Sequence, residues 1–213
     1  MKETDIRPEE LMQRYLELSK SDAISCFGNE PRESISCIAC GSSSISSAFD
    51  KYGFGYGLCQ DCGTLYQTPR PILSAFEMFY RDSISSKYFA ETFAPTVEES
   101  RREKIFRPRV ERLIKICDQL GLDVQRLIDV GAGYGNFLDE CRKQFPNAKM
   151  VAVEPSVALA KECRAKGFDV VESFVEQVSE EYEGFADLVV SFEVLGWKPV
   201  SFVSIKSLSA FFL

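Results

Sequence analysis

The sequence LIDVGAGYGNFL, residues 127–138, decides the fold class of this chain. An apolar run leads into three glycines at alternate positions, and apolar residues resume directly afterwards. Glycine allows a turn to come close to a ligand that a Cβ atom would exclude, and the first turn of a helix offers free backbone N–H groups. The stretch therefore predicts a buried strand, a ligand-binding turn and a helix. A tight turn that binds nothing is the alternative interpretation.

The spacing of the glycines separates two kinds of nucleotide site. A dinucleotide-binding fingerprint needs glycine at the position that Asn136 occupies, so the sequence disfavours a nicotinamide-dependent oxidoreductase. The next apolar run leads to Glu154, which stands 25 residues after Asp129. A carboxylate at the tip of that strand can accept hydrogen bonds from both hydroxyl groups of a ribose.

Strand-like and helix-like patterns alternate around this motif. An amphipathic helix is predicted at 110–120, with Gly121 as its C-cap. Strands are predicted at 126–130, 150–153, 169–171 and 188–192, with one helix ending near Gln144 and another running from Ser156 to near Gly167. Such alternation predicts a parallel sheet with right-handed crossovers, in which we expect the first and fourth strands to be neighbours. The fold class is therefore α/β, with a Rossmann-like doubly wound sheet.

Two C-x-x-C-G motifs lie upstream, with Cys37 and Cys40 in the first and Cys59 and Cys62 in the second. This spacing lets both thiolates of a motif reach one ion at about 2.3 Å. Four thiolates favour Zn²⁺ over rubredoxin-like iron, and two disulfides or four unrelated thiols are the remaining alternatives. A closed set of four ligands leaves no position for water, so the predicted zinc is structural and stabilises a segment too short for a core of its own. Cys117, on an apolar helix face, is predicted to be a core residue.

Composition excludes several function classes. The chain has no histidine, which excludes a Ser-His-Asp triad and a His metal triad. Its formal net charge is -7, whereas a dedicated nucleic-acid-binding protein needs a basic surface, so no nucleic-acid partner is expected. No run of 18 apolar residues is present and the N-terminus lacks a signal-peptide core. We therefore expect no membrane partner and a cytoplasmic location, where the eight cysteines are reduced.

Taken together, the motifs resemble a known family. The segment 129–135, Glu154 and the segment 185–195 look like those of the class I S-adenosylmethionine-dependent methyltransferases. The paired cysteine motifs, followed by Pro69-Arg70-Pro71 and Phe79-Tyr80, resemble the subgroup that carries an N-terminal zinc ribbon. The resemblance spans about residues 35–195. It implies S-adenosylmethionine as cofactor, a structural zinc ion and a small-molecule methyl acceptor, such as a sugar or another biosynthetic intermediate.

The resemblance also implies roles for individual residues. The loop glycines Gly131, Gly133 and Gly135 would lie beneath the methionine part of the cofactor. Asp129 would organise that loop or bind the amino group of the cofactor through water. Glu154 would hold the ribose hydroxyls.

Two further residues each have two possible assignments. Glu193 would lie near the reacting centre and the cofactor, with a solvated surface carboxylate as the alternative. Phe174 would line the adenine pocket or, more simply, belong to the core. No catalytic residue and no oligomeric state are predicted.

The resemblance ends after Leu195. Family members usually continue with Glu-His, whereas this chain continues Gly196-Trp197-Lys198-Pro199 and has no acidic residue from 194 to 213. Too few residues follow Asp129 for a sheet of about seven strands. We therefore expect a C-terminally truncated chain with an incomplete sheet and weak or absent methyl transfer. The alternative function is a non-catalytic zinc-ribbon interaction module with a vestigial cofactor-binding half, and the retained glycine loop argues against it.

These patterns divide the chain into five parts. We expect an N-terminal helix within residues 1–25, centred on an amphipathic pattern at 8–20, and a zinc ribbon at 26–71. An aromatic-rich connector at 72–99 leads to a partial methyltransferase core at 100–195, and an atypical tail follows at 196–213.

Overall fold

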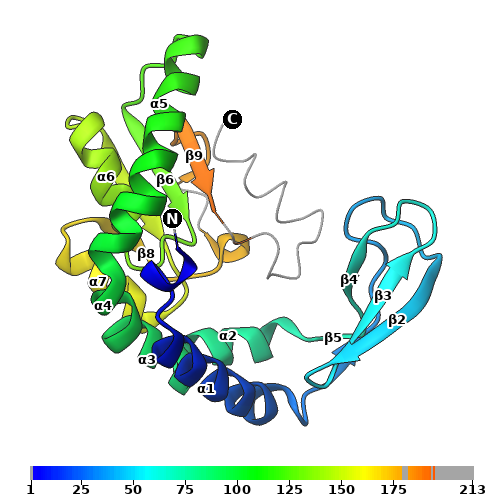
Figure 1. The fold of residues 1–213 in the computed structure, drawn as a ribbon. Helices are drawn as coiled ribbons and strands as arrows, with labels where there is room; N and C mark the ends of the chain where they lie inside the picture. The colour runs from blue at the N-terminus through cyan, green and yellow to red at the C-terminus, as the bar shows by residue number, and fades with distance from the viewer. Residues whose placement is uncertain (1, 179–181, 193, 195–213) are drawn as a thin grey trace.

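The computed structural model describes residues 2–178, 182–192 and 194. A parallel sheet with its helices lies at one end of the molecule and a small antiparallel sheet at the other, and α1 (Glu9–Phe27) and α2 (Leu73–Asp82) run between them (Figure 1). The predictions for Glu193 and for residues 196–213 lie outside the described residues. None of the described helices is long and apolar enough to cross a membrane.

The larger sheet has four described strands, all parallel. They are β6 (Arg126–Val130), β7 (Lys149–Val153), β8 (Asp169–Val171) and β9 (Leu188–Ser191), in the order β8-β7-β6-β9. Leu127 in β6 pairs with Met150 on one side and with Leu188 on the other. The strand positions and the adjacency of the first and fourth strands confirm the prediction. Parallel pairing brings the C-terminal ends of the strands to one edge, where ligands bind in open α/β sheets.

Alternate residues of the strands pack on opposite faces of this sheet. The first face packs against the helices α5 (Arg107–Leu120), α6 (Asn136–Gln144) and α7 (Val157–Ala165). Cys117 lies in this cluster, which confirms its prediction as a core residue. On the second face, Ile128 and Val151 pack against Val175 in η4 (Val175–Gln177) and against Ala186. Both faces of β6 and β7 are therefore covered, as their continuous apolar sequences require.

One long helical segment leads into the sheet. It consists of α3 (Ile84–Tyr88), the π-helical turn η2 (Phe89–Phe93), α4 (Ala94–Arg101), a second π-helical turn η3 (Arg102–Phe106) and α5. Pro95 and Pro108 follow the two π turns, each at the second position of the next helix. Proline has no N–H to donate and its ring collides with the carbonyl four residues back, and the wider turn accommodates both defects. The predicted boundary between residues 99 and 100 falls inside α4, because the helix continues across it.

The first long helix extends further than the predicted 8–20 and includes Cys26. Cys26 packs beside Phe27 and Ala75 in a small apolar cluster, so the helix, and not the ribbon, contains residue 26. The buried carboxylate of Asp22 accepts the backbone N–H groups of Ile84 at 3.3 Å and of Ser85 at 2.7 Å. These bonds satisfy free N–H groups at the start of α3 and fasten α1 to it.

Short antiparallel strands make up the small sheets. β2 (Ile45–Lys51), β3 (Phe54–Cys59) and β4 (Leu65–Gln67) form one, and β1 (Arg32–Glu33) pairs with β5 (Arg70–Pro71) in another. The glycines at 53, 55 and 57 alternate with aromatic residues, a pattern typical of small twisted hairpins. A Cβ atom at Gly57 would lie 2.6 Å from the Ile45 side chain and 2.8 Å from that of Thr68, so glycine lets the strands approach closely.

Candidate cofactor pocket and metal centre

The glycine-rich loop joins β6 to α6 at the C-terminal edge of the sheet. Gly131, Gly133 and Gly135 have φ angles of 77°, 57° and 75°, a left-handed conformation that other residues rarely adopt. The N–H of Gly131 donates to the carbonyl of Val153 at 2.8 Å, which ties the loop to the end of β7. The strand, turn and helix predicted for residues 127–138 are confirmed.

The three glycines have different surroundings. A Cβ atom at Gly133 would meet no atom of the described residues within 4 Å, so within this part of the chain Gly133 faces open space. A Cβ atom at Gly135 would come within 3.2 Å of the sulfur of Cys163 on α7, and one at Gly131 would collide with the side chain of Val194. Gly135 therefore permits close helix packing, whereas Gly133 leaves room for a ligand.

Glu154 follows β7 and lies beside the loop, with only 4% of its surface exposed. One carboxylate oxygen accepts the N–H of Gly133 at 2.8 Å, and the other accepts the N–H of Ser156 at 2.9 Å. Each carboxylate oxygen has a further lone pair, so the group can hold the loop and also accept hydrogen bonds from a ligand. The structure thus brings together two predicted site residues, Gly133 and Glu154, that are 21 positions apart in the chain.

Asp129 is buried at the end of β6, with 3% of its surface exposed. Burial and the nearby Glu154 carboxylate raise the pKa of Asp129 to about 7, and Arg109 opposes this rise. Two acidic groups that repel each other in a site with little water favour a positively charged ligand, because a cation relieves the repulsion.

A pocket of about 230 Å³ opens beside Gly131 and Glu154. Part of its wall comes from far upstream, with Tyr15 from α1, Tyr80 from α2 and Phe89 from η2. Burial, reinforced by the negative charge of Glu154, raises the pKa of Tyr80 to about 12, so its hydroxyl remains protonated at neutral pH. None of these three aromatic residues was a predicted site residue. The aromatic-rich composition of residues 72–99 is a signal for Tyr80 and Phe89, whereas Tyr15 belongs to the amphipathic pattern at 8–20. The other lining residues are Ser86, Pro155, Leu159, Phe192 and Val194.

Three other residues singled out in the sequence have different outcomes. Phe174 is buried with its ring centre 5.6 Å from that of Tyr80, edge to face, and does not line the described pocket, so it is a core aromatic. Ser156 precedes α7 as predicted, but its hydroxyl makes no capping bond. Glu193 lies outside the described residues, and its role stays a prediction.

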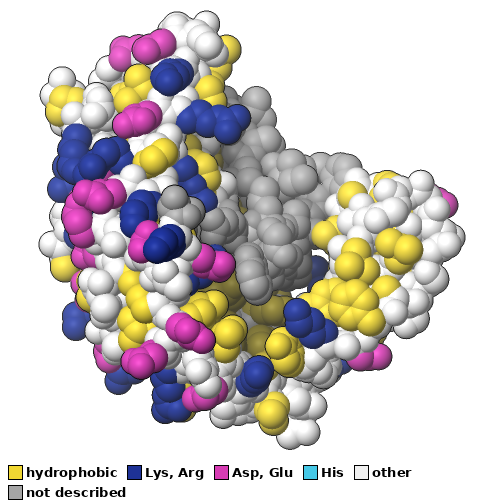
Figure 2. All heavy atoms as spheres, in the orientation of Figure 1, with side chains coloured by type: hydrophobic (Ala, Val, Ile, Leu, Met, Phe, Trp, Pro, Cys, Tyr) yellow, Lys and Arg dark blue, Asp and Glu magenta, His cyan; other side chains and the backbone are white. Residues whose placement is uncertain are grey.

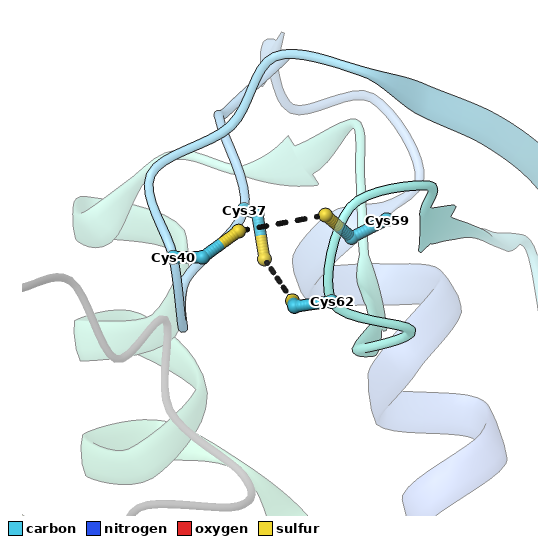
Figure 3. A group of neighbouring side chains, drawn as sticks. All are labelled: Cys37, Cys40, Cys59 and Cys62. Carbon is cyan, nitrogen blue, oxygen red and sulfur yellow. Dashed lines mark hydrogen bonds between the residues drawn. The ribbon is translucent and has the colours of Figure 1, made fainter.

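The predicted metal ligands converge. The sulfur atoms of Cys37, Cys40, Cys59 and Cys62 point toward one another from two loops (Figure 3). All four lie within 4.8 Å of one another, with 3.5 Å between Cys37 and Cys62 and 3.6 Å between Cys40 and Cys59. Four thiolates placed tetrahedrally around zinc have sulfur–sulfur separations of about 3.8 Å. The donor set and its spacing therefore fit one Zn²⁺ ion.

Backbone groups complete this metal centre. Gly41 and Gly63, which follow the two motifs, have φ angles of 78° and 72°. Burial opposes ionisation of Cys37, but hydrogen bonds from the N–H groups of Cys40 and Ala39, together with those from the Cys62 and Cys40 side chains, lower the pKa of Cys37 to about 6. They favour the thiolate, which is the form that binds metal. The other cysteines, Cys26, Cys117, Cys141 and Cys163, are buried free thiols.

A family described as a methyltransferase domain matches residues 97–212. The chain belongs to this methyltransferase family. The matched part of the methyltransferase begins in α4 and includes β6 to β9, so α1, α2 and the ribbon lie outside it. No curated protein matches the chain.

Several solved structures are similar to part of this chain at low sequence identity. A candidate S-adenosyl-L-methionine-dependent methyltransferase from Methanococcus maripaludis is 18% identical, with a TM-score of 0.46 over 56% of this chain and 57% of that one. The plantazolicin methyltransferase BpumL in complex with SAH is 12% identical, with a TM-score of 0.47 over 63% of this chain and 50% of that one. The sugar N-methyltransferase KedS8 from Streptoalloteichus sp. ATCC 53650 is 18% identical, with a TM-score of 0.46 over 55% of this chain and 47% of that one. This chain spans about half the length of each protein.

Proposed function

We propose that this chain binds S-adenosylmethionine in the pocket beside the glycine loop and transfers its methyl group to a small-molecule acceptor. The observation that carries the proposal is the hydrogen bond between Gly133 and Glu154, which sets an open glycine and a buried acid side by side at the edge of the sheet. Membership of the methyltransferase family supports the same activity.

The residues present fit this cofactor. The space at Gly133 would receive the methionine part, Glu154 would hold the ribose hydroxyls, and Asp129 would organise the loop or bind the amino group through water. The sulfonium and ammonium groups of the cofactor are cationic, which matches two neighbouring buried carboxylates. When bound, the cofactor supplies a methyl group that is already activated for displacement.

The chain itself would align and enclose the reactants. Tyr15, Tyr80 and Phe89 form an apolar wall that excludes water from the pocket, and alignment is the main requirement for transfer from an activated donor. No catalytic base is assigned. With a pKa of about 12, Tyr80 is suited to donating a hydrogen bond at neutral pH and not to removing a proton.

We also propose that the four-cysteine site binds one structural Zn²⁺ ion. The converging sulfur atoms and the N–H groups directed at Cys37 support this assignment. Four protein ligands leave no open position at the metal, so the ion would stabilise the ribbon and take no part in methyl transfer.

The proposed acceptor is a small molecule and not a nucleic acid. Figure 2 shows acidic side chains interspersed with Lys and Arg over the helical side of the molecule, and the whole chain carries a net charge of -7. Binding to phosphate backbones needs a concentrated basic surface. The zinc-ribbon resemblance implies a sugar or another biosynthetic intermediate as acceptor. The cytoplasmic location stays a prediction.

Calorimetric titration of the full chain with S-adenosylhomocysteine tests the proposal. The wild-type chain should bind one equivalent, and Glu154→Gln should weaken binding. The matched control is Glu172→Gln, since Glu172 pairs with Arg164 outside the pocket and its loss should leave the affinity unchanged. A wild-type chain that binds nothing would contradict the proposal and favour the non-catalytic zinc-ribbon module.

Activity itself needs a second assay. Transfer of labelled methyl from S-adenosylmethionine to a panel of small acceptors measures it directly. Transfer to any acceptor of the panel would support the proposed function, whereas cofactor binding without transfer would favour the non-catalytic zinc-ribbon module.

A further inference from the structure

We propose that Lys166 is a positioning residue that holds the glycine loop in its binding shape from outside the pocket. This inference rests on the proposed function, because it concerns the loop assigned there to the cofactor. Its basis is a cluster of contacts that no motif in the sequence indicates.

Lys166 directly follows α7, and its side chain is 17% exposed. Its ammonium group donates to the amide oxygen of Asn136 at 2.5 Å and to the Glu98 carboxylate at 3.0 Å. It also lies 3.6 Å from the carboxylate of Asp139 and 4.2 Å from the ring centre of Tyr134. One cation therefore contacts both residues that flank Gly135 and links them to α4 and α6.

Asn136 explains why the loop departs from the dinucleotide fingerprint. It is the first residue of α6, and its side chain is almost fully buried. Glycine at this position would offer no side chain to anchor. The amide oxygen of Asn136 instead accepts a charge-assisted hydrogen bond from Lys166, a stronger type than a bond between neutral groups.

Tyr134 is held from the same direction. Burial and the negative charges of Glu162 and Glu98 raise the pKa of the Tyr134 hydroxyl. Glu162 belongs to the last turn of α7, close in sequence to Lys166. The ring face of Tyr134 therefore lies against the Lys166 ammonium group, in an environment that two carboxylates make negative.

These contacts hold Tyr134 and Asn136, which lie close in sequence to the open residue Gly133. Gly133 directs its N–H at Glu154, and this requires the loop to keep its left-handed turns. Without Lys166, the side chains of Tyr134 and Asn136 lose a shared anchor. Cofactor binding would then carry the entropic cost of ordering the loop. The affinity for the cofactor should therefore fall while the sheet stays folded.

The test compares Lys166→Met with Lys143→Met in the full chain. Lys143 pairs with Glu140 at 2.6 Å in the same group of ion pairs, so it is a matched lysine that does not hold the loop. Lys166→Met should weaken binding of S-adenosylhomocysteine about tenfold, which is the lower end of the effect of losing one hydrogen bond to a charged group. It should also speed hydrogen exchange at the Gly133 amide. Lys143→Met should do neither, and Lys166→Arg should restore part of the affinity.

The outcomes separate this inference from the proposed function. Unchanged affinity and unchanged Gly133 exchange in Lys166→Met would overturn the role of Lys166. A wild-type chain that fails to bind S-adenosylhomocysteine would overturn the proposed function, and the exchange measurement would still decide whether Lys166 holds the loop. If Lys166→Met does not fold, Asn136→Ala removes the acceptor of the same hydrogen bond and should speed exchange at Gly133 in the same way.

Discussion

The ribbon and the parallel sheet of this chain are stabilised by different means. The buried apolar cluster of the ribbon consists of Cys37, Cys59 and Tyr66, and two of these three are proposed metal ligands. The parallel sheet instead packs into two larger clusters in which Ile128 and Leu138 are completely buried. A segment with so small a core depends on its metal, whereas the sheet depends on apolar burial.

The two regions are nevertheless connected by aromatic contacts. The ring centre of Phe54 in β3 lies 5.6 Å from that of Phe27 in α1. The ring centre of Phe27 lies 5.3 Å from that of Phe79 in α2. The next residue, Tyr80, contacts Phe174 beside the sheet. The comparison shows that each region has its own source of stability, while α1 and α2 join the ribbon to the wall of the cofactor pocket.

Loss of the metal should have the largest effect and separate the two regions most clearly. Structural zinc contributes on the order of 10 kcal/mol, so Cys59→Ser should unfold residues 30–68 and leave β6 mostly native. Hydrogen exchange should show lost protection in β2 to β4 and retained protection at Ile128. Cys117→Ser is the control, because Cys117 is a packing residue and its replacement should leave the zinc in place. A wild-type chain with intact thiols and little zinc would contradict the prediction.

A cavity in the sheet core should produce the converse result. Leu138 is completely buried, and Leu138→Ala should lower the free energy of unfolding of the sheet by about 3–5 kcal/mol. Denaturant unfolding measures this loss, and elemental analysis should still find the metal in the ribbon. Leu120→Ala, at a side chain that is 73% exposed, should have little effect. Release of zinc together with unfolding of the sheet would show that the two regions unfold as one unit.

The cofactor site should respond without either region unfolding. Glu154→Ala should weaken binding of S-adenosylhomocysteine by about 2–3 kcal/mol, because it removes a charged hydrogen-bond acceptor. Gly133→Val should abolish binding, since it fills the open space beside Glu154 with a side chain. Calorimetry gives both affinities. Equal binding by wild type and both variants would mean that the loop is only a turn.

A pH dependence confined to the sheet should be about as large as the effect of Glu154→Ala. The folded state raises the pKa of Asp129 to about 7, so folding favours the protonated form. The contribution of Asp129 to the free energy of unfolding is fully present below its unfolded pKa of about 3.9. This contribution is lost as the pH rises through the folded pKa near 7. Asp129→Asn should remove this loss, so between pH 5 and pH 8 the wild type should lose about 2–3 kcal/mol of unfolding free energy that the variant keeps, because one unit of pKa shift corresponds to about 1.4 kcal/mol. Denaturant unfolding at pH 5 and pH 8 checks it, and parallel losses in both proteins would exclude Asp129 as the cause.

The parts of the fold that could be predicted are those specified by residues close together in the sequence. Buried parallel strands such as β6 and β7 read as short continuous apolar runs, and the two C-x-x-C-G motifs specify their own turns. The glycine loop and Glu154 follow strand ends, so their meeting at one edge follows from parallel pairing.

Other features depend on packing between distant segments. Tyr15 reaches the pocket because Asp22 fastens α1 to α3, a contact between residues 62 and 63 positions apart. Lys166 contacts the loop only because α7 packs on Gly135. No periodicity or motif in the sequence encodes such contacts. The π turns were missed for a different reason, because Pro95 and Pro108 ordinarily signal the start or end of a helix.

The two sheets also differ in the length of chain that each must close. β2 and β3 are joined by the turn at Tyr52 and Gly53, both with positive φ, whereas Arg126 at the start of β6 binds Asp187 across 61 residues. The entropic cost of closing a loop of n residues grows as 1.5RT ln n. Closing the 61-residue loop therefore costs about 3 kcal/mol more than closing the short turn. Contacts between near neighbours form first, and the ribbon also leaves the ribosome first. We therefore expect zinc to bind during synthesis, before the strands that form the cofactor pocket have met.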